Sequence, residues 1–220
     1  MNIGLLPGLR GDPAEFDLLL PFLLPLGRTH ELGLPATTDD TLDRIAAYVA
    51  RDGPDLRGLD VLIGASFGGL LGRALVSAGL TRARLVLIGT LPHPDAPPAA
   101  RRCLALGTLV PALPTPIYRQ LYERRAQAEW EQDSNRPWSI SGLPTPAVLG
   151  ARLRAIGRWG LPPLPPGTLC CWGDRDRFVT WTAAQVSGWG GVPLPLAGAH
   201  RPHVADPEAT AARIGAALGW

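Results

Sequence analysis

The chain has 220 residues, enough for one substantial hydrophobic core and few for two independent domains, so a single domain with an insertion is expected. Its 46% hydrophobic and 18% charged residues exclude the intrinsically disordered class. A net charge of +2, without any run of five like charges, gives no reason to expect nucleic acid or a membrane as a partner.

The use of lysine and cysteine narrows the possible chemistry further. All 21 basic residues are arginine, which excludes a lysine Schiff base and a P-loop lysine. The three cysteines form no C-x-x-C pair, and the adjacent Cys170 and Cys171 would point to opposite faces of a strand. Without a disulfide framework, a basic leader or an apolar stretch of membrane-spanning length, the sequence predicts a cytoplasmic protein.

Apolar runs alternate with segments of helical periodicity along most of the chain. Asn2–Leu6 reads as a buried strand that opens into a loop. Asp12 followed by Pro13 predicts the start of a helix, which Pro21 and Pro25 interrupt. The later predicted strands, the last two with their loops, cover residues 28–35, 58–65, 83–90, 167–176 and 191–200, and the later predicted helices cover residues 41–50, 66–80, 116–132, 146–159, 180–189 and 206–218.

This order of elements predicts an α/β fold. Strands that are apolar on both faces favour a mostly parallel sheet with helices on both sides. Residues 92–166 break the alternation, because they are Pro-rich at both ends and carry helical segments between. We therefore expect one domain, residues 1–220, with a helical cap inserted at roughly 92–166, after the fourth strand.

The turn after the third predicted strand carries a G-x-S-x-G pattern, Gly64-Ala65-Ser66-Phe67-Gly68. A serine at a sharp strand-to-helix turn, with glycines that leave room on both sides, is typical of a nucleophile elbow. The alternative is a glycine-rich turn of the dinucleotide-binding kind, but the G-x-G-x-x-G pattern is absent. We predict that Ser66 is a nucleophile.

A serine nucleophile needs a base, and the chain has four histidines. His200 follows the last predicted strand and is the best placed, because catalytic groups gather at the carboxyl ends of parallel strands. His203 is an alternative base whose more common role would be packing. His30 lies within a strand and reads as structural, and His93, at the mouth of the insertion, could at most touch substrate.

Three aspartates could orient the base. Asp174 and Asp176 follow the fifth predicted strand and give the chain order Ser, Asp, His, and Asp95 is the runner-up. A metal site at His200-x-x-His203-x-x-Asp206 is disfavoured, since the segment is predicted as a loop without a helical H-E-x-x-H frame. No metal and no organic cofactor is expected.

The residues "GASFGG", "WGDRDRFV" and "GAHRPHVADPE" together resemble the α/β-hydrolase fold superfamily over nearly the whole chain. Within it, the chain looks most like small esterases with a compact helical cap, such as the pimeloyl-carrier-protein methyl ester esterase group. The resemblance implies a sheet of about six strands. It also assigns Ser66 as nucleophile, Asp176 as acid and His200 as base.

The same resemblance implies an oxyanion hole made by the backbone N–H groups of Leu9 and Phe67. Two features depart from the family pattern. The oxyanion loop reads Pro7-Gly8-Leu9-Arg10 where the family usually has His-Gly, and the chain starts at the oxyanion strand, without the two antiparallel strands that often open the fold.

The expected activity is that of a carboxylesterase acting on a small-molecule ester or thioester through an acyl-enzyme. The alternatives are the same fold running lyase, cofactor-free oxygenase or haloperoxidase chemistry, or a non-catalytic binding protein. Arg10, His93, Tyr118 and Trp130 are candidate substrate contacts, and Arg201 beside the base could attract an acidic substrate. The expected lining residues of the insertion are Leu104, Leu109, Ile117, Tyr118, Trp130 and Trp138.

Overall fold

The computed structural model describes residues 1–90, 97–134, 142–158, 160 and 163–220. Within this part of the chain, six strands form one sheet in the order β2-β1-β3-β4-β5-β6, and every pairing is parallel. The predicted sheet of about six strands is confirmed. It was expected to be mostly parallel, and all of its described pairings are parallel. The strands are β1 (Asn2–Leu6), β2 (Arg28–Glu31), β3 (Val61–Ala65), β4 (Arg84–Ile88), β5 (Leu169–Gly173) and β6 (Val192–Leu196).

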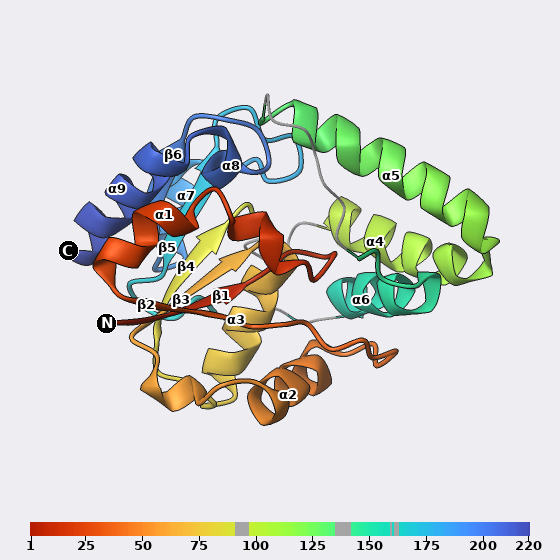
Figure 1. The fold of residues 1–220 in the computed structure, drawn as a ribbon, viewed down its shortest axis with the longest axis horizontal. Coiled ribbons are helices and arrows are strands. Elements are labelled where there is room, and N and C mark those ends of the chain that lie inside the picture. Colours follow the sequence, from red (N-terminus) through yellow and green to blue (C-terminus); the bar gives the residue numbers. More distant parts are fainter. Residues whose placement is uncertain (91–96, 135–141, 159, 161–162) are drawn as a thin grey trace.

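Helices cover both faces of the sheet, which Figure 1 shows in the centre of the molecule. On one face, α1 (Leu20–Leu23) and α9 (Pro207–Leu218) pack on the strands. On the other face lie α2 (Leu42–Asp52), α3 (Phe67–Ser77) and α7 (Ala183–Gly188). The sheet is therefore buried on both sides, which is why its strands read as continuous apolar runs.

Side chains alternate between the two faces, as the strand geometry requires. Cys171 lies in the cluster beneath α9, together with Ile63 and Val86, whereas Cys170 lies in the cluster that includes Val186 of α7. The predicted opposite orientation of the two cysteines is confirmed, and both thiols are free. Each large apolar side chain removed from water in these clusters contributes about 1.5–3 kcal/mol to folding.

Three longer helices connect β4 to β5: α4 (Pro97–Leu109), α5 (Thr115–Glu131) and α6 (Pro146–Arg158). Figure 1 shows them together beyond one end of the sheet, with α5 reaching from the neighbourhood of α4 and α6 back toward α8 (Pro202–Ala205). Near its start, α5 is anchored by Tyr118, which packs against Leu149 and Leu153 of α6.

Three segments differ from the sequence-based expectation. The helix expected after Asp12 is a series of short turns, namely η1 (Pro13–Phe16), α1 and η2 (Leu24–Leu26), because Pro21 and Pro25 lack the N–H groups that a continuous helix needs. Helix α4 was not expected, since it begins at a Pro-Pro pair within a Pro-rich stretch. The predicted loop after His200 contains α8. The remaining 3-10 turns are η3 (Leu56–Gly58) and η4 (Val110–Ala112).

Across the described ranges, the helices are too short or too polar for any of them to cross a bilayer.

Candidate active site

Ser66 occupies a strained turn between β3 and α3. Its backbone has φ 51° and ψ −111°, and it is the one non-glycine residue with positive φ among those that the structure describes. Such a conformation is costly for a residue with a Cβ and persists only where the surroundings fix it. The Ser66 N–H donates to the Ile88 carbonyl at 2.7 Å, and the Ser66 carbonyl accepts from the Thr90 hydroxyl at 3.1 Å. The turn is thus pinned to the end of β4.

Two glycines make this turn sterically possible. A Cβ on Gly64 would lie 2.6 Å from the carbonyl carbon of Gly68. A Cβ on Gly68 would overlap the Leu6 carbonyl oxygen and lie 2.5 Å from that of Pro7. The close approach at Gly68 brings the first turn of α3 against the loop that follows β1.

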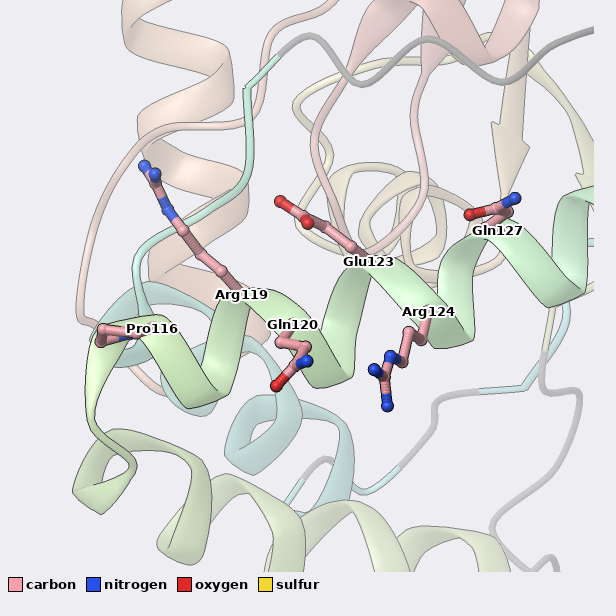
Figure 2. Close-up of a pocket in the computed structure, with 6 residues that line it drawn as sticks. All are labelled: Pro116, Arg119, Gln120, Glu123, Arg124 and Gln127. Atoms are coloured by element: carbon pink, nitrogen blue, oxygen red, sulfur yellow. The ribbon is translucent and has the colours of Figure 1, made fainter.

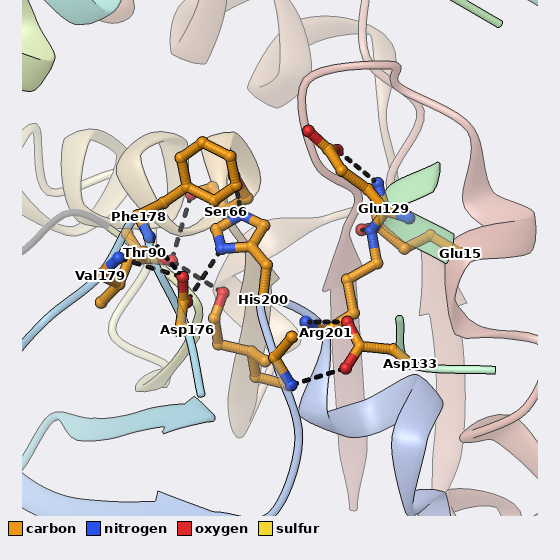
Figure 3. Close-up of polar contacts among 12 residues, drawn as sticks. Glu15, Ser66, Thr90, Glu129, Asp133, Asp176, Phe178, Val179, His200 and Arg201 are labelled. Atoms are coloured by element: carbon orange, nitrogen blue, oxygen red, sulfur yellow. Dashed lines mark hydrogen bonds and ion pairs between the residues drawn. The ribbon is translucent and has the colours of Figure 1, made fainter. Parts of the chain in front are cut away.

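The structure brings Ser66, His200 and Asp176 together at the carboxyl ends of three strands (Figure 3). The His200 Nε2 atom lies 3.2 Å from the Ser66 Oγ atom. The His200 Nδ1 atom lies 2.9 Å from Asp176 Oδ2. The Asp176 side chain is fully buried, whereas that of His200 remains 19% exposed. The imidazole therefore bridges a partly exposed hydroxyl and an enclosed carboxylate.

Asp176 is held in place by its own loop. Its Oδ1 atom accepts the backbone N–H groups of Phe178, at 2.7 Å, and Val179, at 3.1 Å, which leaves Oδ2 facing the imidazole. Asp174, the other candidate in this loop, has an exposed side chain that accepts from the Gly198 N–H at 3.0 Å. Asp95 lies outside the described residues.

The other histidines lie apart from this arrangement. His203 is 1% exposed and packs against Phe16, with the ring centroids 5.6 Å apart and the rings tilted by 36°. Burial lowers its pKa to about 4, so its ring is neutral at pH 7. His30 lies on β2, with its Nε2 atom 3.4 Å from Asn2 Oδ1. In the described ranges no group of His, Cys, Asp and Glu gathers that could hold a metal ion, and Asp206 caps α9 through the Ala209 N–H.

The loop after β1, where Leu9 lies, is supported from two sides. Glu15 Oε2 accepts the Gly8 N–H at 2.6 Å, and Arg152 of α6 donates to the Leu9 carbonyl at 2.7 Å. The peptide that carries the Leu9 N–H therefore lies between two anchored peptides. Burial lowers the pKa of Arg152 to about 10, which still leaves it charged at neutral pH. These two side chains supply support in a loop that lacks the family's usual histidine.

The position of this loop in the sheet is informative. The chain runs from β1 outward to β2 and from β3 outward through β6, so the direction of winding changes between β1 and β3. In open parallel sheets ligands bind at the carboxyl ends of the strands on either side of such a switch point. The Leu9 loop follows one of these strands and Ser66 follows the other.

Arg201 is engaged by acidic side chains. Its guanidinium lies 3.7 Å from Glu15 Oε1 and 3.6 Å from Glu129 Oε2 of α5. Burial alone would raise the pKa of Glu15, but Arg201 and the Gly8 N–H are among the groups that bring it below its usual value. With two carboxylates beside it, Arg201 is a poor receptor for an acidic substrate.

The residues predicted to contact substrate differ in how exposed they are. Tyr118 is buried and donates its hydroxyl to the Pro144 carbonyl at 2.7 Å. Trp130 is also buried, and Arg10 is partly buried close enough to Glu15 to affect its pKa. Of the remaining lining residues, Leu104, Leu109 and Ile117 are exposed, and His93 and Trp138 lie outside the described residues.

Phe178 is a neighbour of the site that the sequence did not indicate. Its ring is 50% exposed and meets the His200 ring edge-on, with centroids 5.2 Å apart. The guanidinium of Arg125 on α5 lies 5.6 Å from the same ring. The only available signal was its position two residues after Asp176. Phe178 stands beside the imidazole as an apolar surface that a substrate could contact.

A separate depression follows the outer face of α5 (Figure 2). Its described lining is exposed and consists of one proline and five polar or charged residues, and it excludes Ser66, Asp176 and His200. The depression is therefore separate from the arrangement of Ser66, Asp176 and His200. Its lining residues are Pro116, Arg119, Gln120, Glu123, Arg124 and Gln127.

Comparison with known proteins identifies the family of the chain. The model of the alpha/beta hydrolase family matches residues 5–213, nearly the whole chain. The chain therefore belongs to the alpha/beta hydrolase family. Among the curated proteins, none matches the sequence.

Solved structures with the same fold include enzymes of several kinds. A thermophilic esterase from Thermogutta terrifontis has a TM-score of 0.74 at 17% identity, with 100% of this chain and 89% of that chain covered. An enol-lactonase from Burkholderia xenovorans LB400 has a TM-score of 0.69 at 16% identity, covering 100% and 91%. A thioesterase from the prodiginine biosynthetic pathway in Streptomyces coelicolor has a TM-score of 0.64 at 20% identity, covering 100% and 90%. At these identities the likeness establishes the fold.

Proposed function

We propose that the protein is a serine hydrolase that cleaves a carboxylic ester or thioester through an acyl-enzyme on Ser66. The observation that carries the proposal is the engagement of both His200 nitrogens, Nε2 with Ser66 Oγ at 3.2 Å and Nδ1 with Asp176 Oδ2 at 2.9 Å. A hydroxyl, an imidazole and a carboxylate in this sequence of contacts make up a serine nucleophile with its base and its orienting acid.

In the proposed reaction, Ser66 Oγ attacks the carbonyl carbon while His200 Nε2 takes the hydroxyl proton. Asp176 holds the Nδ1–H and stabilises the imidazolium that forms. The N–H groups of Leu9 and Phe67 are the proposed donors to the oxyanion. His200 then protonates the leaving alcohol or thiol. A water molecule, deprotonated by the same nitrogen, attacks the acyl-enzyme, and the breakdown of this second intermediate returns the proton to Ser66.

The substrate class is proposed from the family and the surroundings of the site. The fold neighbours include an esterase and a thioesterase, which act on acyl groups carried by oxygen or sulfur. Phe178 offers an apolar contact next to His200, where either leaving group would depart. We further propose that residues 92–166 act as a cap, because α5 places Arg125 against Phe178 at the edge of the site.

A fluorophosphonate probe tests the nucleophile directly. We expect the wild-type protein to be labelled and to hydrolyse a short p-nitrophenyl ester with a burst of product. Ser66→Ala should lose labelling and lower kcat by about 10⁴- to 10⁶-fold. Ser77→Ala, at an exposed position near the end of the same helix, is the matched control and should behave as wild type.

The outcome also separates the competing functions. A folded wild-type protein that is neither labelled nor active on any ester or thioester would favour a binding protein and would contradict the proposal. Labelling without turnover of a panel of acyl lengths, on both oxygen and sulfur leaving groups, would favour the non-hydrolytic alternatives.

A further inference from the structure

The carboxylate of Asp133, just beyond the end of α5, binds the loop that carries His200. Its Oδ1 atom accepts the Ala199 N–H at 2.6 Å, and its Oδ2 atom accepts the Arg201 N–H at 3.1 Å. These two amides stand immediately before and after His200. Asp133 itself is 7% exposed. Figure 3 shows the carboxylate on the opposite side of the His200 loop from Ser66 and Asp176.

The position of this acid is unfavourable unless the two bonds compensate for it. The carboxyl end of a helix carries a partial negative charge, which disfavours a carboxylate there. Burying the charge away from water adds a further cost. Hydrogen bonds from backbone N–H groups to a carboxylate are among the stronger kinds, and here both oxygens receive one. The two hydrogen bonds of the Asp133 side chain therefore stabilise the loop of His200 and not the helix that precedes Asp133.

The geometry at Ser66 depends on the backbone of this loop. The His200 ring must meet Ser66 Oγ on one side and Asp176 Oδ2 on the other, and neither contact fixes the main chain of residue 200. A displacement of about 1 Å in a reacting group can cost about 10²-fold in rate. Two hydrogen bonds that flank residue 200 limit such displacement.

We propose that Asp133 is a positioning residue: it ties the end of α5 to the backbone on both sides of His200 and so holds the imidazole against Ser66. The proposal deepens the proposed function and rests on it. Asp133 touches neither Ser66 nor the substrate carbonyl in this scheme. It acts through His200.

A second connection joins the same helix to the other side of the site. Arg201, whose N–H is bound by Asp133, places its guanidinium between Glu129 of α5 and Glu15. Glu15 in turn accepts the Gly8 N–H in the loop that carries Leu9. Helix α5 is therefore linked to the loop of the base directly and to the proposed oxyanion loop through Arg201 and Glu15.

The test compares Asp133→Asn with a matched variant, Glu131→Gln. Glu131 lies two residues earlier, is exposed, and pairs only with Gln127 among the contacts of the described chain. In Asp133→Asn, the amide oxygen can still accept one of the two backbone N–H groups. The amide NH2 group, which is a donor, would face the other N–H and could not bind it. We expect kcat for a p-nitrophenyl ester to fall about 10- to 100-fold in Asp133→Asn, with KM within about twofold of wild type.

Two further readouts separate positioning from general stability. The acidic limb of the kcat/KM pH profile, which reports on the base of the free enzyme, should move in Asp133→Asn and stay in place in Glu131→Gln. The downfield proton resonance of His200 Nδ1–H should weaken in the first variant alone. Asp133→Glu, which keeps a carboxylate, should recover part of kcat.

The proposal is overturned if Asp133→Asn melts near the wild-type temperature and keeps the wild-type kcat and pH profile. If this variant does not fold, amide hydrogen exchange in the wild-type protein decides. Slow exchange at Ala199 and Arg201 supports the two hydrogen bonds, and exchange at the rate of an open loop refutes them. A wild-type protein that is inactive and unlabelled would instead refute the proposed function.

Discussion

The turn of Ser66 and the loop of His200 lie side by side but are held in different ways. The turn depends on its own glycines and on the ends of the neighbouring strands β1 and β4. The loop of His200 depends on side chains from distant parts of the chain, with Asp133 separated by 66 residues from Ala199. The turn of Ser66 is thus held mainly by close backbone contacts around its own glycines, whereas the loop of His200 is held by a side chain from a distant part of the chain.

This difference decides how each half responds to substitution. Backbone crowding should be severe in the turn, because the neighbouring atoms are backbone atoms at the end of β1, in the loop after it and in the first turn of α3. In the loop, the loss of a polar partner should change where the imidazole lies while the fold survives.

Beyond Ser66 itself, the largest effect is expected where the loop of His200 meets Asp176. In Asp176→Asn, the side-chain oxygen can still accept the Phe178 and Val179 amides, so the NH2 group would face His200 Nδ1. The imidazole would then carry its proton on Nε2 and could not take one from Ser66. We expect kcat to fall about 10³- to 10⁴-fold with little change in melting temperature.

Asp174→Asn is the matched control for that measurement. Asp174 lies in the same loop and accepts the Gly198 N–H through an exposed side chain, a bond that asparagine can keep. Its kcat should stay within about twofold of wild type. Equal losses of kcat in both variants would mean that kcat depends on the loop as a whole and not on the contact between Asp176 and His200.

In the turn, we expect Gly68→Ala to disrupt the structure. Its Cβ would meet the backbone oxygens of Leu6 and Pro7, which cannot withdraw without moving β1 and the loop that carries Leu9. The free energy of unfolding should fall by about 3 kcal/mol or more. Denaturant unfolding followed by far-UV circular dichroism measures the change.

Gly72→Ala, one turn further along α3, provides the comparison. A Cβ there would meet only side chains, with the nearest atoms of Leu85 and Leu62 at 3.4 and 3.5 Å. Because alanine is favoured over glycine in a helix, this variant should be neutral or more stable by up to about 1 kcal/mol. A similar loss in both variants would show that the crowding at Gly68 is not specific to the turn.

The same contrast explains what the sequence could predict. The order of strands and helices along the chain, the parallel sheet and the turn of Ser66 follow from apolar runs, glycines and short spacings, which neighbouring residues in the sequence provide. Asp176 could be distinguished from Asp174 only through the family resemblance, because both follow the same strand. Nothing near Asp133 or Glu15 indicated their contacts with the loops of His200 and Leu9, since those depend on how distant segments pack. Helix α4 could not be predicted because its first turn begins at two prolines within a proline-rich stretch, a composition that usually indicates a loop.

The smallest expected effect concerns His203, the buried neighbour of the His200 loop. Its folded-state pKa of about 4 lies below the unfolded value near 6.5. The unfolded chain therefore binds more protons between these values, and stability falls as the pH decreases through this window. Between pH 7 and pH 5, we expect this ring to lower the free energy of unfolding by about 2 kcal/mol. The range stays above the lowered pKa of Glu15, so that carboxylate remains charged throughout.

Denaturant unfolding at pH 7, 6 and 5 checks this expectation in wild type and in His203→Asn, which cannot gain the proton. The variant should show about 2 kcal/mol less dependence on pH, whatever its stability at pH 7. His30→Asn is the control, because its ring lies partly exposed on β2 and is not enclosed. If His203→Asn keeps the wild-type dependence, the ring is reached by water or by a proton in the folded protein. The region behind the His200 loop would then be less tightly closed than the turn of Ser66, which would sharpen the contrast between the two halves of the site.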